Sequence, residues 1–434
     1  MNALAMEKSL LDRPLPNPPL PEETSSEDWV LPHYDGLSIA NLPATIATLL
    51  RTDLPGALPS LPGALWDDWT PGLRRVVLIV LDALGYRALQ RMWAAGEGRA
   101  FADLAKAGRL APLTSVFPST TAAALVSLRT GCPPAQHGWL AYTMYLREMG
   151  IASNAIMLCP VWTRRTDMMV DWGLDPERIV SIPSLAARLA AVGVTTRAVL
   201  RSAFGRSAFT QMLYQGVAEI RLHRHASDLW VQLRHVLAET RGQPAFITAY
   251  WSGLDTLAHA YGPDTDLWEA EFQTVDHLLE RQLLTALPGE DREGTLLLVT
   301  ADHGQIHVPP EQILTASEDP ELSQHLMVPI VGESRAAFVY PRPGRAQAIR
   351  DYLESEFPGC FIVLDSAEGL EAGLMGRPIA DETHARAGEL LVLPRGNRAL
   401  QRAMPSVPLL GRHGGLTHDE MLVPLIGARL DALG

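Results

Sequence analysis

The chain has 434 residues, of which 47% are hydrophobic and 20% are charged, so it is long and apolar enough to build a sizeable globular core. Its formal net charge is −13, and this negative balance argues against a nucleic-acid polymer as the main partner. A small anionic substrate is not excluded, because bound divalent cations would reverse the sign of the charge locally.

The first residues of the chain and its cysteine content indicate the cellular compartment in which the protein is expected. The first residues lack the apolar core of a signal peptide, and no stretch has the roughly 18 uninterrupted apolar residues that a membrane span needs. Cys132, Cys159 and Cys360 form no CxxC pair, and this low, odd count fits a reducing compartment. We therefore expect a cytoplasmic protein without a membrane partner, and the sequence leaves its oligomeric state open.

Residues 13–23 are rich in proline, which fixes φ and lacks the N–H group, and they are typical of an extended arm. We expect residues 1–75 to form this arm and a segment that wraps the main domain, residues 76–434. A protein that acts only through a polyproline-binding partner is disfavoured, because the arm lacks a repeated PxxP pattern with flanking arginine.

From Val76 the chain alternates between apolar runs and amphipathic segments. The run VVLIVL is rich in β-branched residues and indicates a strand buried on both faces. Similar runs occur at Ala245–Tyr250, Thr295–Thr300, Ala336–Tyr340, Cys360–Leu364 and Glu389–Leu393. The segment Leu267–Leu287 has apolar residues near helical spacing. This alternation predicts an α/β fold: a doubly wound, mainly parallel sheet with helices on both faces.

Two insertions are expected in this domain, at about residues 139–172 and 201–240. The first contains Trp, Tyr and several Met, and we expect either a lid that forms a substrate wall or an irregular packed insertion. The second is rich in arginines that either bind a substrate phosphate or lie on a solvated helix face. These arginines are Arg201, Arg206, Arg221, Arg224 and Arg234.

Acidic residues follow three of the predicted strands, where open parallel sheets carry their functional groups. Asp82 ends the VVLIVL run, Asp255 follows FITAYWSGL, and Asp302 and His303 follow TLLLVTA. One such aspartate is usually a helix cap or a turn residue. Three of them, two with a histidine nearby, indicate a site.

The histidines point to a metal. Asp255 and His259 are four residues apart, which places both side chains on one side of a helix, and a carboxylate with an imidazole suits zinc or a similar ion. Gly304 after His303 allows a tight turn, and His413 is also followed by glycine. The remaining candidates are interpreted as structural: His137, His277, His307 and His418.

Residues 116–138 contain a Pro–Ser–Thr–Thr turn followed by a helix of small residues. Thr120 and Thr121 lie at the start of this helix, where free N–H groups and the helix dipole attract anions. A hydroxyl at that position is either a helix cap or a nucleophile activated by a metal. The residues alone do not separate the two threonines.

Five segments together resemble the type I phosphodiesterase/nucleotide pyrophosphatase family of the alkaline phosphatase superfamily. They are VLIVLDALG, FPSTTAAALVSLRTGCPPAQHG, DTLAHAYGP, TADHG and RHGGLTHDEM, in the order of the family, from Val77 to Met421. The resemblance implies that Thr121, the fourth residue counted from Pro118, is the nucleophile. One metal ion would be held by Asp82, Thr121, Asp302 and His303, and the other by Asp255, His259 and His413.

The implied activity is hydrolysis of a phosphodiester or nucleotide pyrophosphate through a threonyl-phosphate intermediate and two divalent metal ions. Zinc is expected because three ligands are histidines, with Mn²⁺ as the alternative. The expected partner is a small phosphorylated substrate such as a nucleotide. A binding protein with a vestigial site is disfavoured, because all seven ligand positions hold competent residues.

One position departs from the family. Its diesterases carry an asparagine three residues after the nucleophile, where it binds a phosphate oxygen, and this chain has Ala124. Losing such a donor costs about 10²–10³ in rate, so a phosphomonoesterase and a phosphonate hydrolase remain alternatives. A sulfatase is disfavoured because Gln136 stands where the motif that begins at Cys132 requires arginine, and a phosphomutase agrees less well with the order of the motifs.

Overall fold

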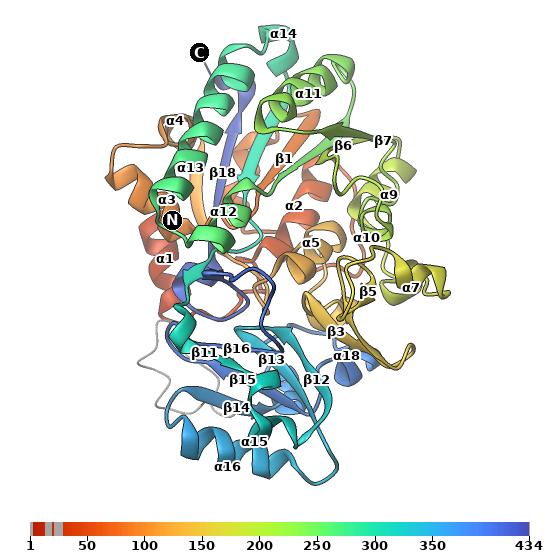
Figure 1. Cartoon of the computed structure of the whole chain (residues 1–434). Helices are drawn as coiled ribbons and strands as arrows, with labels where there is room; N and C mark the ends of the chain where they lie inside the picture. Colours follow the sequence, from red (N-terminus) through yellow and green to blue (C-terminus); the bar gives the residue numbers. More distant parts are fainter. Residues whose placement is uncertain (1–2, 14–19, 21–28, 434) are drawn as a thin grey trace.

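The computed structural model describes residues 3–13, 20 and 29–433 (Figure 1). Most of the predicted proline-rich arm, residues 13–23, lies outside the described residues. Within the described ranges, no helix combines the length and apolar character needed to cross a membrane.

The main sheet has seven strands in the order β2-β18-β9-β1-β8-β6-β7. Their bounds are β1 Arg75–Leu81, β2 Arg109–Thr114, β6 Thr195–Arg201, β7 Glu219–His223, β8 Ala245–Trp251, β9 Thr295–Thr300 and β18 Leu422–Arg429. Strand β1 pairs in parallel with both β8 and β9, whereas β18 is antiparallel to β2 and β9. Every residue of β1, β8 and β9 is buried, which confirms three of the predicted apolar strands.

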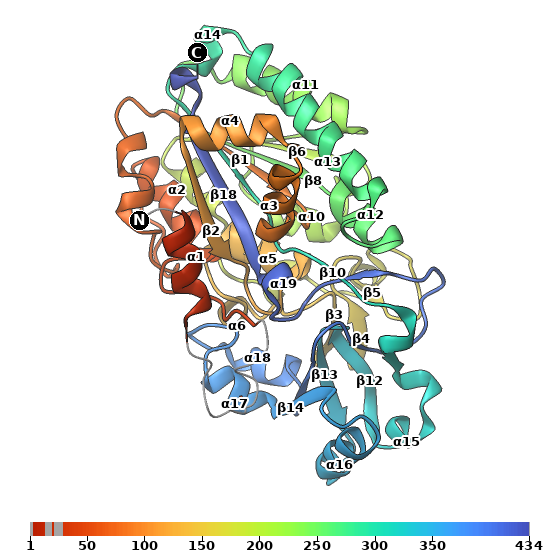
Figure 2. The same ribbon diagram turned by 90° about the vertical axis from the view of Figure 1, so that its left-hand side faces the viewer.

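Helices cover both faces of this sheet, so the doubly wound prediction is confirmed (Figures 1 and 2). One face of the sheet is covered by α3, α4, α13 and α11. The other face is covered by α2, α5 and α9, which contact one another. The bounds are α1 Ala3–Leu11, α2 Leu42–Leu49, α3 Tyr86–Ala94, α4 Arg99–Ala107, α5 Thr121–Thr130, α9 Leu185–Ala191, α10 Ala208–Leu213, α11 Ala226–Glu239, α12 Gly253–Tyr261 and α13 Asp266–Leu278. The predicted helix 267–287 is α13 continued by a π-helical segment, Leu279–Thr285.

A second, antiparallel sheet lies beyond the lower edge of the main sheet in Figure 1, in the order β14-β15-β13-β12-β3-β4-β5. Its strands are β3 Thr143–Leu146, β4 Ile151–Asn154, β5 Cys159–Pro160, β12 Leu326–Glu333, β13 Ala336–Pro341, β14 Phe361–Asp365 and β15 Leu390–Pro394. The apolar runs 336–340, 360–364 and 389–393 are therefore strands, but their assignment to the main sheet was wrong. A buried apolar run looks the same in either sheet, and its pairing is decided by distant partners.

The other α-helices and strands complete the fold. They are α6 Pro134–His137, α7 Met168–Asp171, α8 Pro176–Ile179, α14 Gly289–Arg292, α15 Pro320–Ser323, α16 Ala346–Glu356, α17 Ser366–Glu371, α18 Asp381–Arg386, α19 His418–Met421, β10 Ile306–His307, β11 Ile313–Thr315, β16 Ala399–Gln401 and β17 Gly411–Arg412.

The two predicted insertions occupy different layers. Residues 139–172 supply β3, β4 and β5 to the second sheet, followed by α7. Residues 201–240 supply β7, an edge strand of the main sheet, and α11, which contacts β6, β7 and β8. In the described part of residues 1–75, α1 contacts β2 and α2 contacts α5.

Candidate active site

The carboxyl ends of three neighbouring parallel strands gather the acidic residues. Asp82 directly follows β1, Asp302 lies two residues after β9, and Asp255 lies in the first turn of α12, which begins just after β8. Since β8, β1 and β9 are adjacent in the sheet, these three carboxylates meet at one edge.

Thr121 is the first residue of α5, and its hydroxyl points into this group of carboxylates. Its Oγ1 lies 3.0 Å from His303 Nε2 and 3.5 Å from Asp82 Oδ1. The neighbouring Thr120 is the N-cap residue, is buried, and directs its hydroxyl to Glu333 instead. The structure thus separates the two threonines, which the sequence left equivalent, and only Thr121 contacts the candidate metal ligands.

All seven predicted residues lie in one cluster, and its atoms form two overlapping groups of potential metal ligands. Asp82, Asp302 and His303 form one group, and Asp255, His303 and His413 form the other, with ligand atoms within 4.8 Å of one another in each. His259 joins the second group, since its Nε2 lies 3.3 Å from Asp255 Oδ1. His303 is in reach of both groups, whereas the resemblance places it with Asp82 and Asp302.

The buried carboxylates of the cluster give it the negative charge that a cation-binding site needs. Burial raises the pKa of Asp82 well above its ordinary value, and the carboxylates of Asp255 and Asp302 raise it further. Asp302 Oδ2 is buried and accepts no hydrogen bond within the described ranges. A buried carboxylate oxygen without a partner, beside two more carboxylates, is costly unless a cation neutralises it. The residues present therefore fit divalent metal ions.

Each of the three histidines is oriented by a backbone carbonyl. The Nδ1 atoms of His259, His303 and His413 lie 2.8, 3.0 and 3.0 Å from the carbonyl oxygens of Gly411, Gly304 and Ser119. A carbonyl oxygen only accepts, so Nδ1 carries the proton and Nε2 keeps a free lone pair facing the cluster. Burial, reinforced by His303 and His259, also lowers the pKa of His413 well below its ordinary value, which keeps that ring neutral.

Two residues that the sequence did not reveal donate hydrogen bonds to the carboxylates of Asp82 and Asp255. The Tyr250 hydroxyl donates to Asp82 Oδ2, and Gln305 Nε2 donates to Asp255 Oδ1 at 2.7 Å. Tyr250 lies inside the predicted strand 245–250, and Gln305 follows the TADHG segment. Their places next to motif residues were the available signal, but neither residue type is itself a marker of a site.

Gly304 allows close packing of two loops. A Cβ atom at this position would lie 1.9 Å from the backbone oxygen of Asp419, and the Gly304 N–H donates to the Glu420 carbonyl at 2.8 Å. Its φ is not in the left-handed region, so the turn does not need glycine for that reason. The contact with α19 is what requires it.

A buried ion pair supports the His413 loop. Arg335, in the turn between β12 and β13, donates from Nη2 to Glu420 Oε2 at 3.1 Å, and both side chains are at most 1% exposed. Glu420 Oε1 in turn accepts from the Gly415 N–H at 2.9 Å. Ser119 Oγ donates to the Gly415 carbonyl at 2.8 Å, so this network joins the second sheet, the His413 loop and the turn that leads to Thr121.

A cleft of about 710 Å³ opens over the cluster, and both Thr121 and Asp82 line it. Its walls are mainly apolar and come from both sheets. They include Leu125, Ile156, Met157, Leu200, Phe204, Phe209, Leu213 and Leu400. Residues 139–172, predicted to be either a lid that forms a substrate wall or an irregular packed insertion, supply part of this wall through Ile156, Met157 and Arg164. Ala124 is fully buried and adds no donor to the cleft.

The cleft arginines are not those of the 201–234 segment. The arginines that line it are Arg164, Arg402 and Arg412. Arg221, by contrast, pairs with Glu219 and Glu239. Glu333 also lines the cleft: its Oε1 accepts from the Tyr142 N–H at 2.6 Å, and burial raises its pKa to about 7.

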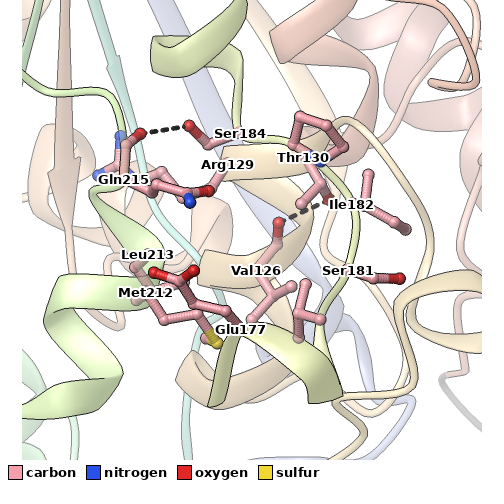
Figure 3. Close-up of a pocket in the computed structure, with 12 residues that line it drawn as sticks. Val126, Arg129, Thr130, Glu177, Ser181, Ile182, Ser184, Met212, Leu213 and Gln215 are labelled. Carbon is pink, nitrogen blue, oxygen red and sulfur yellow. Dashed lines mark hydrogen bonds between the residues drawn. The ribbon is translucent and has the colours of Figure 1, made fainter. Parts of the chain in front are cut away.

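A separate cavity of about 290 Å³ lies at the other end of α5 (Figure 3). Arg129, Glu177 and Gln215 line it, and Ser184 Oγ donates to the Gln215 carbonyl at 2.6 Å. Its lining contains none of the seven clustered residues, so it is not part of the candidate active site.

The histidines interpreted as structural stay outside both ligand groups in the part of the chain that the structure describes. His137 is buried against Ser127, with Nε2 3.0 Å from Oγ, and burial lowers its pKa to about 3.

Solved structures provide the first comparison. The fold resembles murine ectonucleotide pyrophosphatase/phosphodiesterase 5, with a TM-score of 0.63 and 16% identity over 81% of this chain and 87% of the other. An inactive variant of that murine protein in complex with AMP gives a TM-score of 0.62 and 16% identity over 82% and 88%. Phosphonoacetate hydrolase from Sinorhizobium meliloti 1021 in complex with phosphonoformate gives 0.61 and 18% identity over 83% and 95%. At these identities the comparison establishes the fold.

Sequence comparison establishes the family. No match was found among curated proteins. The family model for type I phosphodiesterase/nucleotide pyrophosphatase matches residues 76–415, which is well over half of the chain. The strand-end carboxylates, the oriented histidines and the threonine at the start of α5 all lie within that range. This chain is therefore a member of the type I phosphodiesterase/nucleotide pyrophosphatase family, with an alkaline phosphatase-like fold.

Proposed function

We propose that the protein hydrolyses a small phosphodiester or nucleotide pyrophosphate, with Thr121 as the nucleophile. The observation that carries this proposal is the position of the Thr121 hydroxyl. It lies at the start of a helix, faces the cleft, and is 3.0 Å from a histidine of the candidate metal cluster. Family membership supports a hydrolase of this chemical class.

The chain's residues would hold two divalent ions, most simply zinc, because three neutral imidazoles face three carboxylates. Asp82, Asp302 and Thr121 would serve one ion and Asp255, His259 and His413 the other, with His303 between them. When bound, the ions would supply the positive charge that lowers the pKa of the threonine hydroxyl and neutralises the phosphoryl oxygens.

Thr121 Oγ1 would form a bond to phosphorus as the bond to the leaving oxygen breaks, which gives a threonyl-phosphate. Water would then attack the same phosphorus and release Thr121, so two in-line displacements give net retention. The free N–H groups at the start of α5 are fixed donors for a phosphoryl oxygen, because the first turn of a helix leaves them unpaired. Apolar walls around the cleft reduce competition from water.

A phosphonate hydrolase is the second candidate, because Ala124 weakens the case for a diesterase. The diesterase asparagine has no equivalent at this buried position, so a donor for one phosphoryl oxygen is missing. Phosphonoacetate hydrolase from Sinorhizobium meliloti 1021 has a similar fold.

The test is a parallel assay of three chromogenic esters with zinc-reconstituted and metal-stripped protein: p-nitrophenyl phosphate, bis-p-nitrophenyl phosphate and the p-nitrophenyl ester of thymidine 5′-monophosphate. We expect preferential hydrolysis of the two diesters, lost without metal. Preference for the monoester would replace the proposal with a phosphatase. Absence of turnover on all three, with release of phosphate from a phosphonate, would favour the second candidate.

A further inference from the structure

Two arginines line the cleft and have no acidic partner among the described residues. Arg164, just after β5, donates from Nη2 to Ser406 Oγ at 3.5 Å, and Arg402, just after β16, donates from Nη2 to the Val161 carbonyl at 3.3 Å. Neither guanidinium forms an ion pair within the described ranges. The adjacent Arg165 does, with Asp171 at 2.7 Å, so acids were available to this segment.

These contacts join the two segments that carry the arginines. Both hydrogen bonds join the segment 159–164 to the segment 402–406, one in each direction. Both guanidinium groups therefore line the cleft from neighbouring segments, and an anion in the cleft would stabilise either positive charge. Burial lowers the pKa of Arg402 below its ordinary value, because it disfavours the charged form.

The third cleft arginine is different. Arg412 is buried, donates from Nη2 to Gln401 Oε1 at 2.9 Å, and interacts electrostatically with the carboxyl group of Glu333. Its charge therefore has a counterpart inside the protein. Arg164 and Arg402, which we call the arginine pair, have no such counterpart in the part of the chain that the structure describes.

The remaining cleft lining limits what the occupant can be. Ile156, Met157, Ile330 and Leu400 line the same cleft and belong to the segments that carry or adjoin the arginine pair. A ligand whose phosphoryl group reached Thr121 would meet an apolar surface as well as two guanidinium groups. Guanidinium groups bind carboxylate and phosphate oxygens through paired hydrogen bonds.

We propose that the arginine pair binds a second anionic group of the substrate, a carboxylate or a phosphate, joined to the reacting phosphoryl group through an apolar or aromatic linker. This inference rests on the proposed function of the cleft and specifies its substrate class. A simple diester with neutral substituents would be a poorer substrate than one with a distal negative charge.

The experiment uses matched ligands that differ only in the distal charge. A series of ω-phosphonoalkanoates of increasing chain length is compared with the corresponding carboxyl methyl esters, by calorimetric titration of zinc-loaded protein. A parallel series of α,ω-bisphosphonates distinguishes a distal phosphate from a distal carboxylate. The variants are Arg164→Gln and Arg402→Gln. Arg206→Gln is the matched control, since Arg206 is exposed and near the cleft but does not line it.

At the best chain length, wild type should bind the acid about tenfold or more tightly than its ester, as expected for a charge-assisted hydrogen bond. Each cleft variant should reduce this preference, their combination should abolish it, and Arg206→Gln should leave it intact. Arg206→Gln should also hydrolyse bis-p-nitrophenyl phosphate, which has no distal anion, at the wild-type rate.

Equal binding of acid and ester by wild type would overturn the anion site, whatever the hydrolase assays give. The same holds if the cleft variants weaken both ligands equally. A protein that hydrolyses no phosphoester, yet prefers the acid and loses that preference in the cleft variants, would disprove the proposed function and retain the anion site.

Discussion

The imidazole rings of His303 and His413 stack with their centroids 3.8 Å apart and their planes 14° apart. His303 follows β9, and His413 follows β17 much later in the chain. Burial lowers the pKa of His413, and His303 and His259 lower it further, because two stacked imidazoles cannot both be protonated without strong repulsion. Neutral imidazole is the form that binds a metal ion.

His413→Ala should therefore remove one ion and leave the other. Elemental analysis of zinc-reconstituted protein should fall from about two zinc ions per chain to about one. His277→Ala is the control, because His277 is exposed on α13 and belongs to neither ligand group. Unchanged zinc content in His413→Ala would exclude this histidine as a ligand.

Thr121→Ala should abolish the covalent route, because no oxygen remains to attack phosphorus. We expect kcat/KM for bis-p-nitrophenyl phosphate to fall by about 10³-fold or more, with little change in thermal unfolding. Thr120→Ala is the matched control, since that hydroxyl is directed to Glu333. Near wild-type hydrolysis by Thr121→Ala would disprove the threonyl-phosphate intermediate.

Metal-free protein should gain stability as the pH falls. The folded-state pKa of Asp82 is raised well above its ordinary value, so the folded state binds a proton that the unfolded state has already released. The destabilisation is present above the folded pKa and is relieved as the pH falls through it towards the unfolded value. Urea unfolding of chelator-treated protein should show Asp82→Asn to be more stable than wild type at neutral pH. With zinc present, the order should reverse.

Gly304→Ala should be strongly destabilising, because its Cβ would lie 1.9 Å from the Asp419 carbonyl oxygen and a backbone segment would have to move. A loss of about 1–3 kcal/mol in the free energy of unfolding is expected, together with weaker zinc binding through the displaced His303. Gly289→Ala, where an added Cβ meets nothing within 4 Å, should be nearly neutral in the same denaturant titration.

Arg335→Met should leave Glu420 as a buried charge without its partner. Breaking such a pair costs about 3–5 kcal/mol, and the His413 loop that Glu420 supports should loosen as well. The comparison is Arg147→Met, which breaks the exposed Arg147–Glu382 pair and should cost less than about 1 kcal/mol. Equal stability of the two variants would contradict the structural role given to the buried pair.

Local patterns predicted the part of the fold that depends on local chemistry. The central strands at 76–81, 245–250 and 295–300 are continuous apolar runs, and such runs are stable only where both faces are covered. The apolar runs placed Asp82, Asp255, Asp302 and His303 just after predicted strands. Parallel neighbours bring such ends together, and the seven residues do lie in one cluster.

Pairing between distant segments was decided only by the tertiary structure. The runs at 336–340, 360–364 and 389–393 have the same apolar character as the central strands, yet they pair with one another and with β3–β5 in a separate antiparallel sheet. Likewise β18, the antiparallel member of the main sheet, carries no local mark of its direction.

In the candidate active site too, the tertiary structure decided which side chains meet. Sequence placed Thr120 and Thr121 equally well at the helix start, and only the fold turns Thr121 towards His303 and Thr120 towards Glu333. Tyr250 and Gln305 contribute to the site through their hydrogen bonds to Asp82 and Asp255, and the arginine pair contributes because it lines the cleft. A sequence pattern does not contain these contacts. Residue types and spacing determined which chemistry is available to this chain. Long-range packing determined which side chains meet to perform it, because those contacts join segments far apart in the sequence.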